Sequence, residues 1–291
     1  MRKDIAKELA SLCARNKDGS FSTQADRAII LHAAARTLQK AGFQNLAASS
    51  LKPKHVQVLL EQWRKDGIAI GTLKNRMAAL RWWAEKVGKE NCVPRTNAAA
   101  GIERRSYVAK TSKAQWLDQD ALAKVKHERL RVSLELQQAF GLRREESMKF
   151  QPSYAMEGRT DSIRTKASWC KGGRARVIPI TSDYQREVLQ RAMAIAGSGS
   201  MIPPDKTYKA WLSTYKEGTR SLGLRKLHGL RHGYAQARFE VLAGFKAPVA
   251  GGLSRNQLTQ EQRALDEKVR LQISGELGHA RKEITNIYLS N

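Results

Sequence analysis

Six side chains that bind anions or carry a reactive hydroxyl lie in four short motifs of this sequence. In chain order they are Arg143, Lys171, His228, Arg231, His279 and Tyr288. Guanidinium groups form paired hydrogen bonds to phosphate, and histidine or lysine can transfer protons. A tyrosine hydroxyl becomes nucleophilic where positive charge and a base help it to lose its proton. Together these residue types predict attack by a tyrosine on a phosphodiester, without a metal.

The two arginine motifs predict a function only when they are considered together with the other motifs. Arg143 follows Gly141-Leu142 and lies one helical turn before Glu146, whose carboxylate could orient the guanidinium. His228 and Arg231 are three residues apart, which places both on one side of a helix. A lone arginine is usually a solvated surface residue, and a single His-x-x-Arg is common in a basic protein. Neither motif alone would predict a function.

The other two motifs supply a lysine in a turn and a histidine–tyrosine pair. Lys171 begins a Lys-Gly-Gly sequence, where simple solvent exposure is the ordinary alternative. Tyr288 follows the histidine of Leu277-Gly278-His279 by nine residues. Without that tyrosine, His279 would be interpreted as a hydrogen-bonded residue at a helix end. The other six tyrosines lack this offset and are expected in the core or on the surface.

The charge of the chain favours nucleic acid as a partner. Among 291 residues, 52 are Lys or Arg and 27 are Asp or Glu, which gives a net charge of +25. Residues 1–106 hold 20 basic and 9 acidic residues (net +11), and residues 107–291 hold 32 and 18 (net +14). Both halves are therefore expected to contact a polyanion, with an affinity that falls steeply with salt. A solubilising surface or a ribosome-associated protein is the alternative.

Several other classes are disfavoured by composition. No apolar run approaches the ~18 residues of a membrane-spanning helix, and the charged N-terminus does not resemble a secretory signal. Cys13, Cys92 and Cys170 are odd in number and far apart, which fits neither a disulfide framework nor a zinc site. We expect a protein of the reducing cytoplasm that uses no cofactor and no metal.

The first hundred residues predict helices followed by a linker. Pro53 is a candidate helix start and Thr72 a candidate cap of the next helix. The periodic pattern breaks down from Asn91 to about Gln115, and we expect the linker at 96–115. Basic residues on these helices could contact DNA or simply face water. The candidate DNA contacts of the whole chain are Thr72, Lys74, Arg76, Arg81, Arg104, Arg105, Arg174 and Arg176.

The second half predicts further helices and two short strands. Asp118 is a candidate helix cap, and Ile163–Thr165 and Arg176–Ile180 are expected to pair as strands around a turn at Gly172-Gly173. The stretch from Ala243 to Thr259 predicts a surface loop. The remaining expected helices span about 183–196, 206–222, 229–243, 260–275 and 281–289.

In order and spacing, these motifs resemble those of the tyrosine recombinases, the phage-integrase family. The resemblance to their catalytic domain extends from about Trp116 to the C-terminus. The pattern from Gly71 to Trp83 resembles their helical core-binding domain. The resemblance implies a mainly α fold with a small antiparallel β-sheet: a helical, SAM-like core-binding domain, a linker and an α+β catalytic domain with an insertion. The implied ranges are 1–95, 96–115 and 116–291, with the insertion at about 243–265.

The resemblance also implies a role for each residue. Arg143, which the Gly-Leu spacing favours over Arg144, and Arg231 would bind the phosphate, with Glu146 in support. His228 would donate to the phosphate or assist proton transfer, and His279 would be a further donor. Lys171 would protonate the departing 5′ oxygen. Tyr288 would be the nucleophile and would form a 3′-phosphotyrosine bond.

Three features depart from the family pattern. Phe140 replaces the usual Thr before Gly-Leu-Arg, which we expect to be tolerated. The 48 residues between Arg231 and His279 exceed the common spacing, and only three residues follow Tyr288. Relatives often continue into a tail that docks on a neighbouring subunit. Either such a tail is missing from this chain, or another element, such as the insertion, makes the subunit contacts.

The expected function is site-specific DNA recombination, as an integrase that integrates or excises a mobile element. The expected partner is double-stranded DNA, clamped by the two domains, with four protomers on two sites and a monomer or dimer off DNA. An accessory directionality factor is a further candidate partner. The expected location is the cytoplasm of a prokaryote, associated with the nucleoid. Alternatives are a Xer-like dimer resolvase, a DNA invertase, a type IB topoisomerase and a non-catalytic DNA-binding protein.

Overall fold

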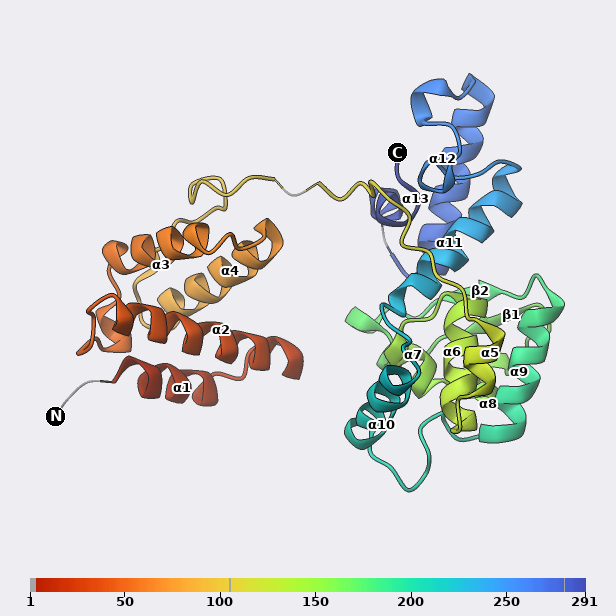
Figure 1. Cartoon of the computed structure of the whole chain (residues 1–291), viewed down its shortest axis with the longest axis horizontal. Coiled ribbons are helices and arrows are strands. Elements are labelled where there is room, and N and C mark those ends of the chain that lie inside the picture. The colour runs from red at the N-terminus through yellow and green to blue at the C-terminus, as the bar shows by residue number, and fades with distance from the viewer. Residues whose placement is uncertain (1–3, 105, 280) are drawn as a thin grey trace. The chain divides into compact units, whose positions relative to one another are not determined.

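The computed structural model describes residues 4–104, 106–279 and 281–291, which fall into two compact units (Figure 1). Unit 1 is Met1–Ser106 and unit 2 is Tyr107–Asn291. The division between them lies inside the segment 96–115 that the sequence predicts to be a linker. Each unit has its own core of apolar side chains. Arg105, one of the predicted DNA contacts, lies outside the described residues.

The described residues of unit 1 form four helices whose apolar faces meet in one core. Pro53 begins α3, as predicted, and Val56 and Trp63 of that helix are buried. Trp83 is fully buried and donates its indole N–H to the carbonyl oxygen of Ala48 at 2.9 Å. The helices are α1 (Ile5–Arg15), α2 (Phe21–Lys40), α3 (Pro53–Lys65) and α4 (Ile70–Lys86), with short 3-10 turns at Ala48–Ser50 and Glu90–Cys92.

The candidate DNA contacts that lie on α4 have different environments. The prediction that Thr72 caps this helix is wrong, because α4 begins at Ile70 and Thr72 lies exposed in its first turn. Arg76 lies over the ring of Trp63, 5.1 Å from its centroid. The Arg81 guanidinium binds the chain that follows α4 and donates to the carbonyl oxygen of Pro94 at 2.8 Å. Arg81 is therefore a structural residue of unit 1.

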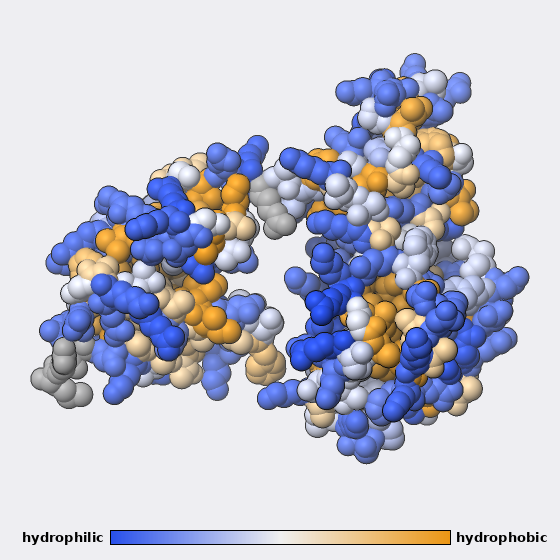
Figure 2. Space-filling model, viewed as in Figure 1, coloured by the Kyte–Doolittle hydropathy of each residue, from blue (hydrophilic) through white to orange (hydrophobic). Residues whose placement is uncertain are grey.

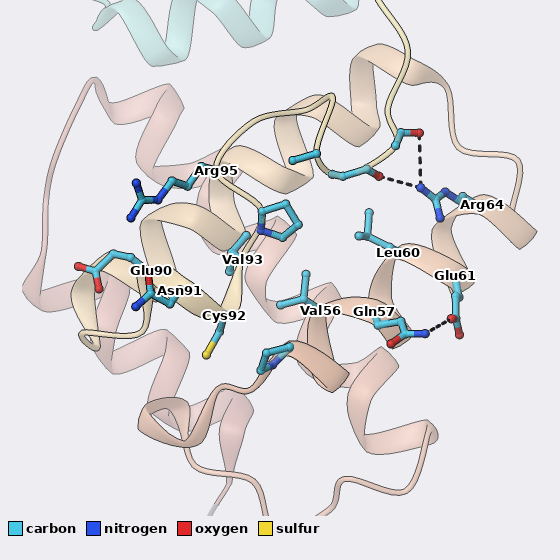
Figure 3. Close-up of a pocket in the computed structure, with 15 residues that line it drawn as sticks. Val56, Gln57, Leu60, Glu61, Arg64, Glu90, Asn91, Cys92, Val93 and Arg95 are labelled. Carbon is cyan, nitrogen blue, oxygen red and sulfur yellow. Dashed lines mark hydrogen bonds between the residues drawn. The ribbon is translucent and has the colours of Figure 1, made fainter.

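Much of the predicted linker is packed against one unit or the other. Arg64 donates from Nη2 to the carbonyl oxygen of Ala100 at 2.7 Å, and Ala100 and Ile102 are buried in the core of unit 1. Figure 3 shows this guanidinium reaching the returning chain at the edge of a groove lined by α3 and the segment after α4. Beyond the boundary, the amide of Gln115 donates to the Gly229 carbonyl of unit 2 at 3.0 Å.

Unit 2 is arranged around a helix that contacts three others. Asp118 caps the first helix, as predicted, and accepts from the amide of Ala121 at 2.8 Å. Helix α6 packs against α7, α9 and α11. The helices are α5 (Gln119–Ala123), α6 (Glu128–Phe140), α7 (Arg144–Lys149), α8 (Pro152–Met156), α9 (Asp183–Ala196), α10 (Tyr208–Ser221), α11 (His228–Ala243), α12 (Gln260–Glu276) and α13 (Asn286–Leu289) (Figure 1).

The two predicted strands form one antiparallel pair. Strand β1 (Ser162–Arg164) pairs with β2 (Val177–Pro179), and Ile163 lies opposite Ile178. Both isoleucines are fully buried, so this register is fixed by the core. Among the described residues this is the whole of the β-structure, and the predicted fold class, mainly α with a small antiparallel sheet, is confirmed.

The C-terminal third differs from the prediction in detail. The single helix predicted at 281–289 is wrong: a 3-10 turn (Lys282–Thr285) leads into the short helix α13. The loop expected between Ala243 and Thr259 contains two 3-10 turns, Pro248–Ala250 and Arg255–Gln257. Its residues Ala247 and Leu258 are buried, so this loop is partly packed onto unit 2.

Hydrophilic side chains cover most of the visible face of both units (Figure 2). Small apolar patches lie among these hydrophilic side chains on each unit. The exposed apolar residues include Val241 of α11 and Leu271 of α12. Across the described ranges, none of the helices has the length and apolar character needed to cross a membrane.

We predict that Arg81→Ala lowers the free energy of unfolding by about 1–2 kcal/mol, because it removes two partly buried hydrogen bonds, to Pro94 and Asn97. Urea denaturation of the full chain provides the measurement. Lys74→Ala, on the same helix, is the matched control and should change stability by less than about 0.5 kcal/mol. Equal effects of both substitutions would contradict the structural role of Arg81.

Candidate active site

A glycine shapes the turn that presents the first predicted arginine. Gly141 ends α6 in the left-handed conformation, with φ of +59°. A Cβ atom at this position would lie 2.6 Å from Cδ1 of Tyr234, so both the backbone angle and the space require glycine. After this turn, Arg143 occupies the N-cap position of α7. Its backbone amide donates to Glu146 at 2.8 Å, which closes the first turn of that helix.

A buried carboxylate pairs with two guanidinium groups. Arg143 Nη1 lies 2.6 Å from Oε1 of Glu146, and Arg176 Nη2 lies 2.7 Å from Oε2. The Glu146 side chain is 1% exposed. Burial alone would raise the pKa of this carboxyl group, but the hydrogen bonds and charge of Arg176, with the charge of Arg143, outweigh it and lower the pKa to about 2. Glu146 is therefore ionised and fixes both arginines.

The prediction that Arg176 contacts DNA is wrong. Its side chain is 5% exposed and donates to Glu146 and, from Nε, to the carbonyl oxygen of Glu276 at 2.7 Å. Arg176 precedes strand β2 and has the same parity as the buried Ile178, whereas Val177 between them is exposed. Alternation along the strand therefore turns this arginine inward.

Arg231 lies at the centre of the candidate site and is 1% exposed. Its Nη1 donates to the carbonyl oxygen of Gly141 at 2.6 Å, and its Nη2 donates to the carbonyl oxygen of Leu277. Arg143 also reaches that Leu277 oxygen, from Nη2 at 3.5 Å. Burial, the largest cause, lowers the pKa of Arg231 to about 10, so the group is still charged at neutral pH. Both predicted phosphate-binding guanidinium groups thus converge on one carbonyl.

The predicted nucleophile lies beside this guanidinium. Tyr288 Oη accepts from Arg231 Nε at 3.2 Å and lies 3.4 Å from Nε2 of His279. The residue is 4% exposed, and its ring packs against that of His232 with centroids 4.6 Å apart. The ring of His228 is also near, at 6.2 Å. The structure therefore brings Arg231, His279 and Tyr288 into direct contact.

The imidazole of His279, beside the phenol, is neutral. Burial, followed by the charge of Arg231, lowers its pKa to about 4, so the imidazole is neutral at neutral pH. Arg231 Nη2 lies 3.3 Å from His279 Nε2, and a guanidinium can only donate. His279 Nε2 is then an acceptor, and the Tyr288 hydroxyl can donate its hydrogen to it. Burial also lowers the pKa of His228, and it lowers that of His232 to about 4.

Other predicted residues are not brought into this cluster. Lys171 is exposed on the turn Lys171–Gly173, and within the described part of the chain no hydrogen bond or ion pair of its side chain is found. Arg174 and Arg104 are exposed, and Lys74 is half-buried, so these three stay candidates for DNA contact. In the described ranges no group of three His, Cys, Asp or Glu side chains is placed to hold a metal ion.

A second buried ion pair lies behind the site and was not predicted from the sequence. Tyr234 donates its hydroxyl to Glu276 at 2.7 Å, and Arg238 pairs with the same carboxylate at 3.1 Å. Glu276 directly precedes Leu277, whose carbonyl receives Arg143 and Arg231. Tyr234 and Arg238 are four residues apart on α11, a spacing that could have marked them as one face.

The sequence matches two family profiles. The one described as "Phage integrase, N-terminal" matches residues 1–93, and the one described as "Integrase" matches residues 103–237. Together they span most of the chain, which belongs to the phage-integrase family of tyrosine recombinases. The second match ends before His279 and Tyr288. No curated protein matches the sequence.

Solved structures of three recombinases share the fold. A lambda integrase dimer bound to a COC′ core site has a TM-score of 0.60 at 15% identity, covering 98% of this chain and 94% of that one. XerH site-specific recombinase bound to palindromic difH gives 0.60 at 16% identity, covering 98% and 81%. The Tn1549 transposon integrase with circular intermediate DNA gives 0.55 at 12% identity, covering 99% and 96%. At these identities the similarity establishes the fold alone.

We predict a change in the pH dependence of stability when Glu146 is neutralised. Its pKa is lowered from 4.5 to about 2, so its stabilising contribution is present above pH 4.5 and is lost as pH falls from 4.5 toward 2. This loss is on the order of 3 kcal/mol. Glu146→Gln should therefore flatten the curve of unfolding free energy against pH in that window, measured by urea denaturation.

Glu145→Gln is the control for this measurement. Glu145 is the adjacent residue, is half exposed and pairs only with Lys149 in the described contacts. Its substitution should leave the slope between pH 4.5 and 2 as it is in the parent protein. Identical pH profiles for the two variants would mean that the buried pair does not govern this window.

Proposed function

We propose that the protein is a site-specific DNA recombinase that cleaves and rejoins DNA strands through a 3′-phosphotyrosine intermediate. The observation that carries this proposal is the contact of the Tyr288 hydroxyl with Arg231 and His279 in a buried, positively charged site. Membership of the integrase family supports it. Double-stranded DNA is the substrate and partner, in keeping with the net charge of +25 and the DNA in the related structures.

The proposed reaction begins with attack of Tyr288 Oη on a phosphorus atom of the DNA backbone. The phenolic proton passes to Nε2 of His279, a role different from that of phosphate donor, which the resemblance implies for this residue. An oxygen–phosphorus bond forms, and the bond from phosphorus to the 5′ oxygen breaks. Arg143 and Arg231 bind the non-bridging oxygens as negative charge builds there. Lys171, on its exposed turn, supplies the proton to the departing 5′ oxygen. Attack by a 5′ hydroxyl on the phosphotyrosine reverses these steps and reseals a strand.

The assembly and biological role are part of the same proposal. Four protomers would act on two DNA sites, as in a lambda integrase tetramer bound to a Holliday junction. The reaction would integrate or excise a mobile element. An accessory factor would set the direction. The domain ranges 1–95 and 116–291 would correspond to core-binding and catalytic domains that grip the duplex together.

A trapping experiment on DNA of random sequence tests the activity and finds the DNA site at the same time. Nicked duplexes lose a short strand after cleavage, so a cleaving enzyme stays covalently attached. Adducts that survive SDS are collected and their DNA is sequenced. A recovered consensus would support site-specific recombination. Relaxation of any supercoiled plasmid without a consensus would indicate a type IB topoisomerase, and DNA binding without adduct would indicate a non-catalytic protein.

We predict that Tyr288→Phe abolishes the covalent adduct, because the ring is retained but the attacking oxygen is lost. SDS gel electrophoresis with labelled DNA is the measurement, and DNA affinity should stay within about threefold of the parent protein. Tyr154→Phe is the matched control, since Tyr154 packs on Trp169 through its ring and should keep full adduct formation. An adduct that persists in Tyr288→Phe would exclude Tyr288 as the nucleophile.

We predict that Arg143→Ala slows single-turnover cleavage by about 10²–10³-fold, as expected for loss of a donor to transition-state charge. Arg144→Ala provides the control at the neighbouring position. The Arg144 side chain is exposed in the first turn of α7, so its removal should change the rate by less than about threefold. The rate of adduct appearance at saturating protein decides between them. Equal losses would move the first arginine role away from Arg143.

A further inference from the structure

The nucleophile helix α13 is held by residues that the recombination chemistry does not use. The amide of Ala109 donates to the carbonyl oxygen of Asn286 at 3.0 Å. The hydroxyl of Ser290 donates to the carbonyl oxygen of Ala109 at 2.7 Å. Asn286 and Ser290 lie two residues on either side of Tyr288. One residue near the start of unit 2 therefore binds the backbone on one side of the nucleophile and a side chain on the other.

Two further contacts reinforce this arrangement. Gln236 of α11 donates from Nε2 to the carbonyl oxygen of Tyr288 itself at 3.0 Å, and Ser112 donates to Oε1 of Gln236 at 3.1 Å. From α12, Arg270 donates from Nη1 to the carbonyl oxygen of Ser290 at 2.7 Å. Arg270 is 5% exposed and is fixed by Asp266 at 2.8 Å, so it is a rigid anchor.

The backbone of Ser290 indicates that these contacts select one conformation of the chain end. Its φ is +64° with ψ of −163°, in a region that favours glycine and costs a residue with a Cβ of order 1–3 kcal/mol. Such a conformation persists when surrounding contacts hold it. Here those contacts are the hydrogen bonds to Ala109 and from Arg270.

We propose that residues 109–112 form a strap that positions the nucleophile, with Ala109 and Ser290 as its principal positioning residues. The strap acts on Tyr288 through the backbone of α13, and among the contacts of the described residues it touches neither the phosphate-binding arginines nor the hydroxyl. Its role in catalysis rests on the proposed function of Tyr288. Loss of strap contacts should leave the arginine site formed but place the phenol less often beside Arg231 and His279.

Two variants of the full chain test the strap. Ser290→Ala removes the hydroxyl donor, and Ala109→Pro removes the amide that donates to Asn286. Thr111→Ala deletes an exposed hydroxyl of the same segment and is the matched control. Hydrogen–deuterium exchange of the peptide 284–291 reports the order of α13 in the free protein. Adduct formation is timed on the duplex recovered by trapping.

We expect Ser290→Ala to speed exchange of this peptide and to slow adduct formation about fivefold, as for one hydrogen bond. Ala109→Pro should slow adduct formation about tenfold or more. The DNA affinity and the midpoint of thermal unfolding of both variants should match those of Thr111→Ala. If the strap contacts served only to stabilise the fold, these two quantities would not need to stay unchanged.

Three results would overturn the strap. They are wild-type exchange and adduct rates in both variants, faster exchange with an unchanged adduct rate, and faster adduct formation, which would make the segment inhibitory. These results differ from failure of the proposed function. In that case the parent protein itself forms no adduct, whereas failure of the strap alone leaves a parent protein that still forms the adduct.

Discussion

The ion pairs of Glu146 with Arg143 and Arg176 are the interaction on which the site depends. Like-charged guanidinium groups that approach one another repel, and burial makes each of them costly. Three guanidinium groups, those of Arg143, Arg176 and Arg231, converge here around this one carboxylate. Carbonyl oxygens of Gly141 and Leu277 satisfy much of the remaining donor capacity. The site therefore keeps an excess of positive charge, which a phosphodiester can neutralise.

This arrangement explains why the ordered motifs lie so far apart in the sequence. The carbonyls that receive Arg231 belong to the glycine turn after α6 and to the end of α12. The guanidinium therefore connects its own helix, α11, to both of these elements. The histidine that follows Leu277 by two residues is then fixed next to the phenol. The same hydrogen bonds that stabilise the fold of unit 2 thus assemble the groups that would attack a phosphate.

The elements were predicted well where a local signal exists. Pro53 and Asp118 begin or cap helices as expected, and the paired strands follow from the short segments on either side of the Gly172-Gly173 turn. Alternation along the strand places Arg176 on the same face as Ile178, but an arginine beside a glycine turn has the composition of a surface contact. Its burial depends on a carboxylate 30 residues away. The hydrogen bonds of Arg81 could not be predicted for the same reason, since its acceptors lie beyond the end of its own helix.

The placement of Tyr288 is the step that local pattern could least determine. Its spacing from His279 selects it among seven tyrosines, but a four-residue helix has too few internal hydrogen bonds to fix its own position. The fixation comes from Gln236 and Arg270, and from Ala109, three residues after unit 1 ends. Ala109, which contacts the nucleophile helix, is thus joined through only a few residues of chain to unit 1, the unit expected to hold the other side of the DNA.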